Sequence, residues 1–111
     1  MLAKAIVKYA KISPRKIREV IDLVRGKDAL EALAVLKATN KKASGILVKG
    51  LNSALANTKK LPNVNEEKLY ISRIFADGGP FLKRFMAQAQ GRATTIRKRT
   101  SHITIELDMK N

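Results

Sequence analysis

The segment 78–105 constrains the fold more than any other part of the chain, because it is strongly basic and contains no acidic residue. Both of its flanks alternate apolar and polar residues with the period of two that is typical of half-buried strands. The expected inner positions are Leu69, Ile71 and Phe75 on the incoming side and Ile103, Ile105 and Leu107 on the outgoing side. The cations between the two flanks are Lys83, Arg84, Arg92, Arg97, Lys98 and Arg99.

We interpret this segment as one long β-hairpin whose base belongs to a folded body. Residues 81–100 carry too few apolar residues at either period to bury a face, so we expect residues of about 79–102 to project as an arm. Some ten residues per strand at ~3.4 Å each give an arm on the order of 30 Å long. Asp77-Gly78-Gly79-Pro80 marks the bend where the hairpin leaves the body, since proline cannot donate to a strand ladder.

The charges of the arm predict its surroundings. A turn centred near Gln90-Gly91 places Lys83 opposite Lys98 and Arg84 opposite Arg97. Like charges opposite each other destabilise a ribbon, and an isolated two-stranded ribbon is already marginal in water. We therefore expect the arm to lie among polyanions such as the phosphates of a nucleic acid. The alternative is a solvated basic loop.

Composition supports a nucleic-acid partner. The chain has 111 residues, with 23 Lys and Arg against 9 Asp and Glu, for a formal net charge of +14. One domain, residues 1–111, is expected at this length. Such a charge attracts nucleic acid and repels further copies of the chain, so we expect no homo-oligomer. No apolar run approaches the ~18 residues of a membrane span, and we expect neither a membrane partner nor a signal peptide.

The N-terminal half reads as a strand followed by three helices. Residues 2–12 alternate as a strand whose expected inner positions are Ala3, Ala5, Val7 and Tyr9. Ser13-Pro14 suits the start of a first helix, with Gly26 just past its end. A capping box at Asp28-Ala29-Leu30-Glu31 opens the second helix.

The third helix is predicted from about Lys41 to Lys59. Its small residues would let another element approach closely; these are Gly45, Gly50, Ser53 and Ala56. The predicted fold is α+β, with three helices packed on one face of a small three-stranded antiparallel sheet and a long protruding β-hairpin.

Two of the helices carry cations where the helix dipole favours anions. Arg15, Lys16 and Arg18 lie at the start of the first helix, and Lys41 and Lys42 lie at the start of the third. Each such charge costs about 0.3–1 kcal/mol, and a bound phosphate would reverse the sign. The alternative is that these cations are ordinary solvated surface side chains.

The sequence shows no catalytic constellation. His102 is the single histidine and there is no cysteine, so a metal cluster is implausible. Ser101 and His102 are adjacent on a strand and point to opposite faces, so they cannot act as a nucleophile and its base. No phosphate-binding glycine motif is present. We expect a chain that is not an enzyme and needs no cofactor or metal.

Several motifs together resemble the bacterial-type L-22 family of large-subunit ribosomal proteins, over nearly the whole length. The most specific are Gly91-Arg92-Ala93 and the run from Lys98 through Arg99, Thr100, Ser101 and His102 to Thr104. Supporting motifs are Asp77-Gly78-Gly79-Pro80 with Lys83-Arg84, Thr39-Asn40-Lys41-Lys42-Ala43, Ser53-Ala54-Leu55-Ala56-Asn57, and Ser13-Pro14-Arg15-Lys16 with Arg25-Gly26-Lys27.

The resemblance implies a structural protein of the bacterial ribosome in the cytoplasm. Its partners would be large-subunit ribosomal RNA, neighbouring large-subunit proteins and, at the hairpin tip, the nascent polypeptide. The tip would line the peptide exit tunnel near the region associated with macrolide resistance. Its residues would be Gln88, Ala89, Gln90, Gly91, Arg92 and Ala93. RNA-binding residues would be Arg15, Lys16, Arg18, Lys41, Lys42, Lys83, Arg84, Arg92, Arg97, Lys98, Arg99, Thr100, Ser101 and His102.

Two other classes were weighed against this one. Architectural DNA-binding proteins with β-ribbon arms insert an apolar wedge, often proline, between base steps, whereas the predicted tip here offers Gln90-Gly91-Arg92. A membrane-surface protein needs a basic helix face opposite large apolar residues, and the third helix is too rich in Gly, Ala and Ser for that.

Overall fold

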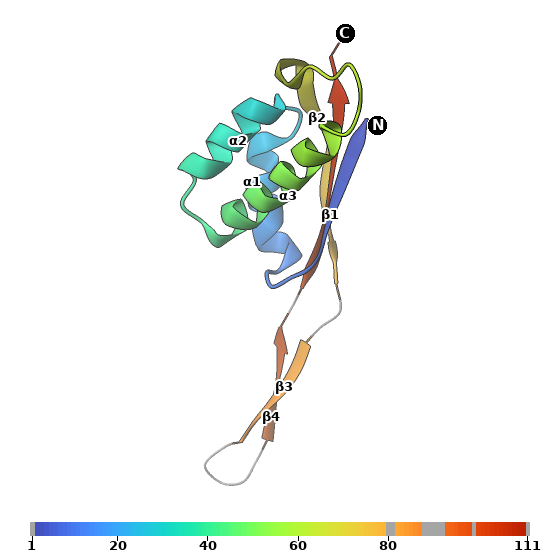
Figure 1. Cartoon of the computed structure of the whole chain (residues 1–111). Helices are drawn as coiled ribbons and strands as arrows, with labels where there is room; N and C mark the ends of the chain where they lie inside the picture. The colour runs from blue at the N-terminus through green and yellow to red at the C-terminus, as the bar shows by residue number, and fades with distance from the viewer. Residues whose placement is uncertain (1, 80–81, 88–92, 99, 111) are drawn as a thin grey trace.

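The computed structural model describes residues 2–79, 82–87, 93–98 and 100–110, with 82–87 and 93–98 described by their backbone. The elements in chain order are β1 (Ala3–Ala10), α1 (Pro14–Val24), α2 (Ala29–Ala38), α3 (Lys42–Thr58), a 3-10 turn (Glu66–Lys68), β2 (Leu69–Gly78), β3 (Leu82–Ala87), β4 (Ala93–Lys98) and β5 (Ser101–Met109) (Figure 1). The β3–β4 ribbon extends from one end of the body, which gives the molecule principal extents of 64 × 25 × 16 Å (Figure 1).

The body is a three-stranded antiparallel sheet in the order β1-β5-β2, with the three helices on one face (Figure 1). The central strand β5 contributes Ile103, Ile105 and Leu107, each at most 1% exposed, to the layer between sheet and helices. From the helices, Ile17 and Leu47 meet this layer and are equally buried. The predicted α+β class and the three-helix layer are confirmed.

Helix α1 begins and ends as its sequence predicts. The Ser13 hydroxyl caps the N-terminus by accepting the backbone N–H of Lys16 at 3.4 Å, and Pro14 occupies the first turn. Gly26 adopts φ +77°, a left-handed conformation that glycine tolerates best. The buried stripe of this helix is the predicted one, Ile17, Val20, Ile21 and Val24.

The predicted capping box of α2 is wrong. Asp28 does occupy the N-cap position, but its side chain makes no capping hydrogen bond. Its carboxylate pairs instead with the ammonium of Lys110, at the end of the chain beyond β5. Asp28 also forms an isolated bridge with Tyr70 at the start of β2, which ties this loop to the sheet. The Asp28 carboxylate thus has a charged partner from a distant segment and makes no local capping contact.

Helix α3 packs on the sheet through Gly50. A Cβ atom at Gly50 would lie 3.0 Å from Ile105 Cδ1 and 3.1 Å from Val7 Cγ2. The other small residues predicted for this face lie elsewhere. Gly45 is exposed, and a Cβ atom there would have nothing within 4 Å, while Ser53 and Ala56 are exposed too. Close approach of helix and sheet is thus confined to one of the four predicted positions.

Two irregularities change which side chains point inward. The register of β2 against β5 shifts between Ile71 and Arg73, so Ile74 and Ala76 are buried where the alternation predicted Phe75. The register of β1 against β5 shifts between Val7 and Ala10. A β-bulge adds one residue to a strand and thereby reverses the side chains that follow it.

Candidate nucleic-acid interface

The N-terminus of α1 presents two of the predicted cations to solvent. Arg15 and Lys16 are exposed in the first turn, and that turn contains no acidic residue. The Ser13 cap and Pro14 fix the direction of the helix start. This end of α1 therefore combines the backbone N–H groups of a helix terminus with two exposed positive side chains, an arrangement that suits an anion.

Arg18 is engaged within the body. Its guanidinium donates from Nε and Nη2 to the carbonyl oxygen of Ala76, at 3.2 and 2.8 Å. These bonds join α1 to the end of β2, just before the bend. Arg18 was predicted to bind RNA, and two of its guanidinium donors are used to hold the base of the ribbon while the residue remains exposed.

The N-terminus of α3 lies beside the loop that leads into α1. Lys41 and Lys42 are both exposed, and the ammonium of Lys42 donates to the carbonyl oxygen of Lys11 at 2.8 Å. The Ser44 hydroxyl accepts the backbone N–H of Lys41 at 3.2 Å. Two cationic helix starts that are far apart in the sequence are thus joined through one loop.

The same loop is joined to the start of β5. Ser101 is fully buried, and its hydroxyl donates to the carbonyl oxygen of Ile12 at 2.7 Å. Thr100 is also buried, at 2% exposed. Both belong to the residues predicted to contact RNA, and both are buried at the base of the ribbon. The sequence could not show this, because Ile12 lies 89 positions away from Ser101.

His102 is half-buried and bound to β1. Its Nδ1 accepts the backbone N–H of Tyr9 at 3.1 Å, and its ring meets the Tyr9 ring edge to face, with centroids 4.8 Å apart. Just after β2, Gly79 donates its N–H to the carbonyl oxygen of Thr100, which directly precedes β5, at 2.9 Å. A Cβ at Gly79 would clash with the Thr100 hydroxyl and lie 3.3 Å from His102 Nε2. Glycine is therefore required where the chain leaves the sheet.

The β3–β4 ribbon is an antiparallel pair that forms its own two-stranded sheet. Its register differs from the expected one by one residue. Lys83 pairs with Arg97 and Arg84 pairs with Ile96, so neither of the two expected like-charge pairings forms, and one new like-charge pairing, Lys83 with Arg97, takes their place. Lys98 lies opposite Leu82. One direct cation–cation pairing remains in the described part of the ribbon, and it still disfavours the isolated arm.

Several predicted site residues lie outside the described part of the chain. These are Gln88, Ala89, Gln90, Gly91, Arg92 and Arg99. Ala93 is described as the first residue of β4.

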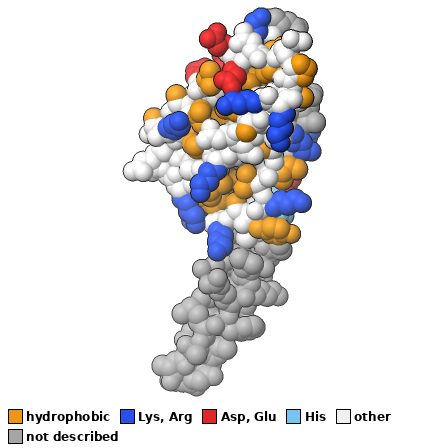
Figure 2. Space-filling model, viewed as in Figure 1, with side chains coloured by type: hydrophobic (Ala, Val, Ile, Leu, Met, Phe, Trp, Pro, Cys, Tyr) orange, Lys and Arg blue, Asp and Glu red, His pale blue; other side chains and the backbone are white. Residues whose placement is uncertain are grey.

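Four of the predicted cations, Arg15, Lys16, Lys41 and Lys42, lie exposed at helix starts near one end of the body. The loop of residues 11–13 touches the N-terminus of α3 through Lys42, leads into the N-terminus of α1, and is held to β5 by Ser101. This is the end from which the ribbon extends (Figure 1). Lysine and arginine side chains are visible over the lower part of the body in Figure 2, next to the ribbon. The starts of α1 and α3 and the loop between β1 and α1 therefore adjoin, and we call their exposed cations Lys11, Arg15, Lys16, Lys41 and Lys42 the basal surface.

Tyr9 is a residue that the sequence placed wrongly. It was expected on the inner face of β1, yet it is 60% exposed and adopts φ +56°. The register shift after Val7 turns it outward and buries Ala10 instead. A positive φ is uncommon for a bulky aromatic residue. No sequence signal marks it, since the residue is neither Gly nor Asn.

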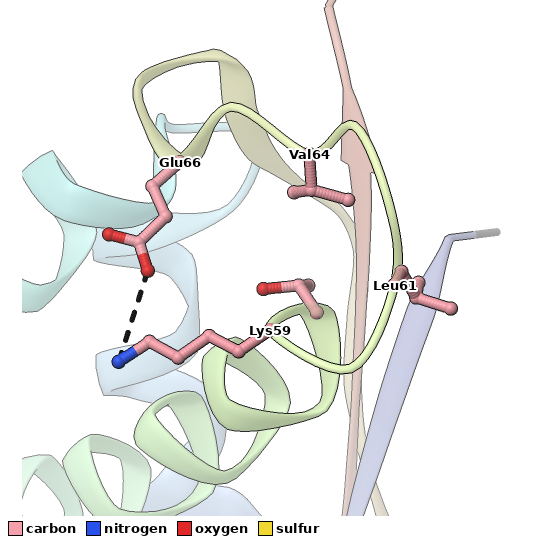
Figure 3. A pocket seen from close by; sticks show the side chains of 5 residues that line it. Lys59, Leu61, Val64 and Glu66 are labelled. Atoms are coloured by element: carbon pink, nitrogen blue, oxygen red, sulfur yellow. Dashed lines mark ion pairs between the residues drawn. The ribbon is translucent and has the colours of Figure 1, made fainter.

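The remaining features of the described residues offer no catalytic chemistry. A depression of about 310 Å³ between the end of α3 and the following loop is lined by Thr58, Lys59, Leu61, Val64 and Glu66 (Figure 3). Its two charged groups, Lys59 Nζ and Glu66 Oε1, face each other at 4.0 Å. Within the described ranges, no cluster of His, Cys, Asp or Glu could hold a metal ion, and no helix is long and apolar enough to cross a membrane.

Comparison with known proteins identifies the family. The family described as ribosomal protein L22p/L17e matches residues 5–108. A protein of Halothermothrix orenii named large ribosomal subunit protein uL22 is 54% identical over 110 residues, which cover 99% of this chain and 97% of the relative. Its namesake in Clostridioides difficile is 53% identical over 110 residues, 99% of each chain.

A third relative with the same name, from Staphylococcus aureus, is 52% identical over 105 residues, which cover 95% of this chain and 90% of the relative. The family match therefore runs from within β1 to within β5 and includes the ribbon. With this similarity along its whole length, and with the basal surface and ribbon described above, the chain belongs to the ribosomal protein L22p/L17e family.

Proposed function

We propose that the chain is a structural, non-catalytic constituent of the large ribosomal subunit in the bacterial cytoplasm, and that it binds the large-subunit ribosomal RNA through the basal surface and the ribbon. Membership of the family and relatives named as large-subunit proteins support the first part. The observation that carries the second part is the convergence of the starts of α1 and α3 on the end of the body from which the ribbon extends.

The charges of the basal surface explain why its ligand is a polyanion. Arg15, Lys16, Lys41 and Lys42 are all exposed. None of these four residues takes part in an ion pair described in the structure. At a helix N-terminus such charges oppose the dipole, and a phosphate bound there is attracted by both. Folded RNA presents phosphates from several strands at once, which matches a surface with several separate cationic points.

The ribbon would reach from this surface into the RNA. Its Lys83–Arg97 pairing is unfavourable in isolation and becomes favourable when phosphates lie on both sides. Lys98 and Arg84 would add contacts along the same strands, and Arg99 and Arg92 would extend them. His102, half-buried at the base of the ribbon, would contribute to the RNA contact together with Thr100 and Ser101 beside it.

The tip and the remaining partners follow from the family. The hairpin tip would line the peptide exit tunnel near the region associated with macrolide resistance and contact the nascent polypeptide. Its residues are Gln88, Ala89, Gln90, Gly91, Arg92 and Ala93. Neighbouring large-subunit proteins would contact the body, and the chain would act as a single copy. The protein would support assembly of the subunit by holding separate RNA segments together.

A charge-matched pair of variants tests the RNA contacts. Lys83→Ala with Arg97→Ala removes two cations from the ribbon, and Lys37→Ala with Lys60→Ala removes two exposed cations from the ends of α2 and α3. Both variants have the same net charge. Binding to bacterial large-subunit ribosomal RNA is measured at a series of salt concentrations. The ribbon variant is expected to lose about one unit of slope in log K against log salt for each lost phosphate contact.

The control variant is expected to keep the wild-type slope, because its cations lie outside the proposed interface. Equal losses in the two variants would show that only net charge matters and would refute specific contacts of RNA with the ribbon. As a direct test, the wild-type protein should co-sediment with large ribosomal subunits, and its absence from that fraction would refute the proposal as a whole.

A further inference from the structure

We infer that the ring of Tyr9 is a stacking site for one unpaired nucleobase, at the junction of the three-stranded sheet and the ribbon. The inference rests on the proposed RNA-binding function and adds a ligand group to it. Tyr9 is uncharged and so is not one of the residues that phosphate binding requires. Its position in the structure is what points to a role in RNA binding.

The backbone holds Tyr9 outward at a cost to the fold. The ring is 60% exposed although it belongs to a strand of the sheet. Its φ of +56° is a conformation that bulky residues rarely adopt, and such strain concentrates at functional sites. The same register shift that turns Tyr9 outward buries Ala10, so the tyrosine ring itself adds nothing to the core.

His102 fixes the direction of the ring. The Tyr9 N–H donates to His102 Nδ1 at 3.1 Å, and the two rings meet at 82° with their centroids 4.8 Å apart. On its other side, His102 Nε2 is the near neighbour of Gly79, which leaves the imidazole little room to turn. An edge-to-face contact uses one side of the tyrosine, so a flat ligand can approach another. The contact with His102 thus restricts the orientation of the Tyr9 ring and leaves another side of it open to a ligand.

The surroundings favour a base that is part of a phosphate backbone. Lys8 and Lys11 flank Tyr9 in the chain and are exposed, and the Lys42 ammonium lies on the Lys11 carbonyl oxygen at 2.8 Å. Asp77, which pairs with His102 in the sheet, is an exposed acid on the opposite strand. Cations on the Tyr9 side would bind the phosphates that flank a stacked base, the usual combination in proteins that hold single-stranded nucleic acid.

The structure indicates one base and not a run of bases. Among the residues whose side chains are described, the other aromatic rings besides His102 are Tyr70 and Phe75, and both are half-buried. Arg73 covers the ring of Phe75 at 4.8 Å from its centroid. Successive bases would need a series of open rings. A single nucleotide turned out of a folded RNA is the ligand that fits, and any base would serve because each has a π-face.

A single-tryptophan reporter tests the inference directly. The chain has no tryptophan, so Tyr9→Trp provides one fluorescent indole at the proposed site, and Tyr70→Trp places one on β2 as a matched control. Both are titrated with bacterial large-subunit ribosomal RNA. We expect the Tyr9→Trp emission to be quenched by stacking and the Tyr70→Trp emission to stay nearly constant. Full RNA binding without quenching of Tyr9→Trp would overturn the inference, and would be expected if a neighbouring protein covers Tyr9 instead.

Two further variants separate stacking from folding. Tyr9→Asn removes the ring and keeps a residue that tolerates positive φ, whereas Tyr9→Phe keeps the ring. Tyr9→Asn should bind about 5- to 150-fold more weakly, the range that one stacked base is worth, with an unchanged salt slope because no cation is lost. Tyr9→Phe should bind like the wild type, and both should melt like it.

Wild-type affinity in Tyr9→Asn would overturn the stacking site and leave the proposed function intact. A wild-type protein that does not bind the RNA at all would refute the proposed function, and the stacking site with it.

Discussion

The contact of Gly50 with the sheet predicts opposite effects for the same substitution at two positions of α3. Gly45 and Gly50 both lie in this helix, so Gly→Ala at either position removes the conformational entropy cost of glycine. At Gly45 the new methyl group meets nothing within 4 Å, whereas at Gly50 it meets Ile105 at 3.0 Å and Val7 at 3.1 Å. Gly45→Ala is therefore the matched control for Gly50→Ala.

The magnitudes follow from two terms. Alanine is favoured over glycine within a helix by about 0.5–1 kcal/mol. Overpacking a core with one extra carbon costs about 1–3 kcal/mol. Gly45→Ala should thus raise the free energy of unfolding by about 0.5–1 kcal/mol. Gly50→Ala should change it by between about zero and a loss of 2 kcal/mol, the difference of the two terms.

Thermal and urea unfolding of the two variants, followed by the circular dichroism of the helices, measure this difference. For a domain of this size, 1 kcal/mol shifts Tm by about 4 °C or slightly more. Val7→Ala makes room for the methyl group, so Gly50→Ala in that background should cost less than in the wild type. If Gly50→Ala stabilises as much as Gly45→Ala, the close approach of α3 to the sheet is refuted.

Three other predictions concern the base of the ribbon and the end of the chain. Arg18→Ala should lower the free energy of unfolding by about 1.5–3 kcal/mol, because it removes both charged hydrogen bonds to β2. The control Arg15→Ala removes a neighbouring exposed cation and should change the free energy of unfolding by less than about 0.5 kcal/mol. Equal effects of the two variants in urea melts would contradict the described role of Arg18. Ser101→Ala should cost about 1–3 kcal/mol because it leaves a buried carbonyl oxygen without its donor, and a wild-type melting curve would show that water replaces the hydroxyl. The hydrogen bond and charge of Asp28 raise the pKa of Lys110 above its ordinary value of 10.5. The stabilisation that the protonated Lys110 gives is therefore complete as the pH approaches 10.5 from below, and it is lost as the pH rises further. NMR titration of Asp28→Asn should show a lower Lys110 pKa, and an unchanged value would exclude the pairing.

The local elements could be predicted because they depend on local chemistry. The start of α1 at Ser13-Pro14, the left-handed Gly26 and the apolar stripe of α1 all follow from residues within a few positions of one another. The alternation of Ile103, Ile105 and Leu107 likewise marks a strand that is buried on one face. The bias toward polyanions needs no structure either, since net charge is a property of the sequence.

The candidate site could be predicted only in part, because burial and partnership are long-range properties. The sequence located the cations at the starts of α1 and α3 from their positions in the helices. It did not show that the two helix starts lie next to each other in the fold. Arg18 and Ser101 were expected to face RNA, and each also donates to a carbonyl oxygen from a distant segment, which the sequence did not indicate. A sequence reveals which side chains can donate hydrogen bonds but does not reveal which acceptors the fold will place beside them.

Short stretches of the sequence suffice to specify the α+β class, the order of the elements and the attraction to nucleic acid, because periodicity, capping and charge are local properties. The packed fold was needed to establish the bulges that turn Tyr9 outward and Ile74 inward, the pairing of Lys83 with Arg97, and the meeting of two helix starts at the base of the ribbon. Side chains alternate along a strand with a period of two, so one inserted residue reverses every later side chain. That insertion is fixed by the packing of the sheet against the helices, which no local pattern encodes.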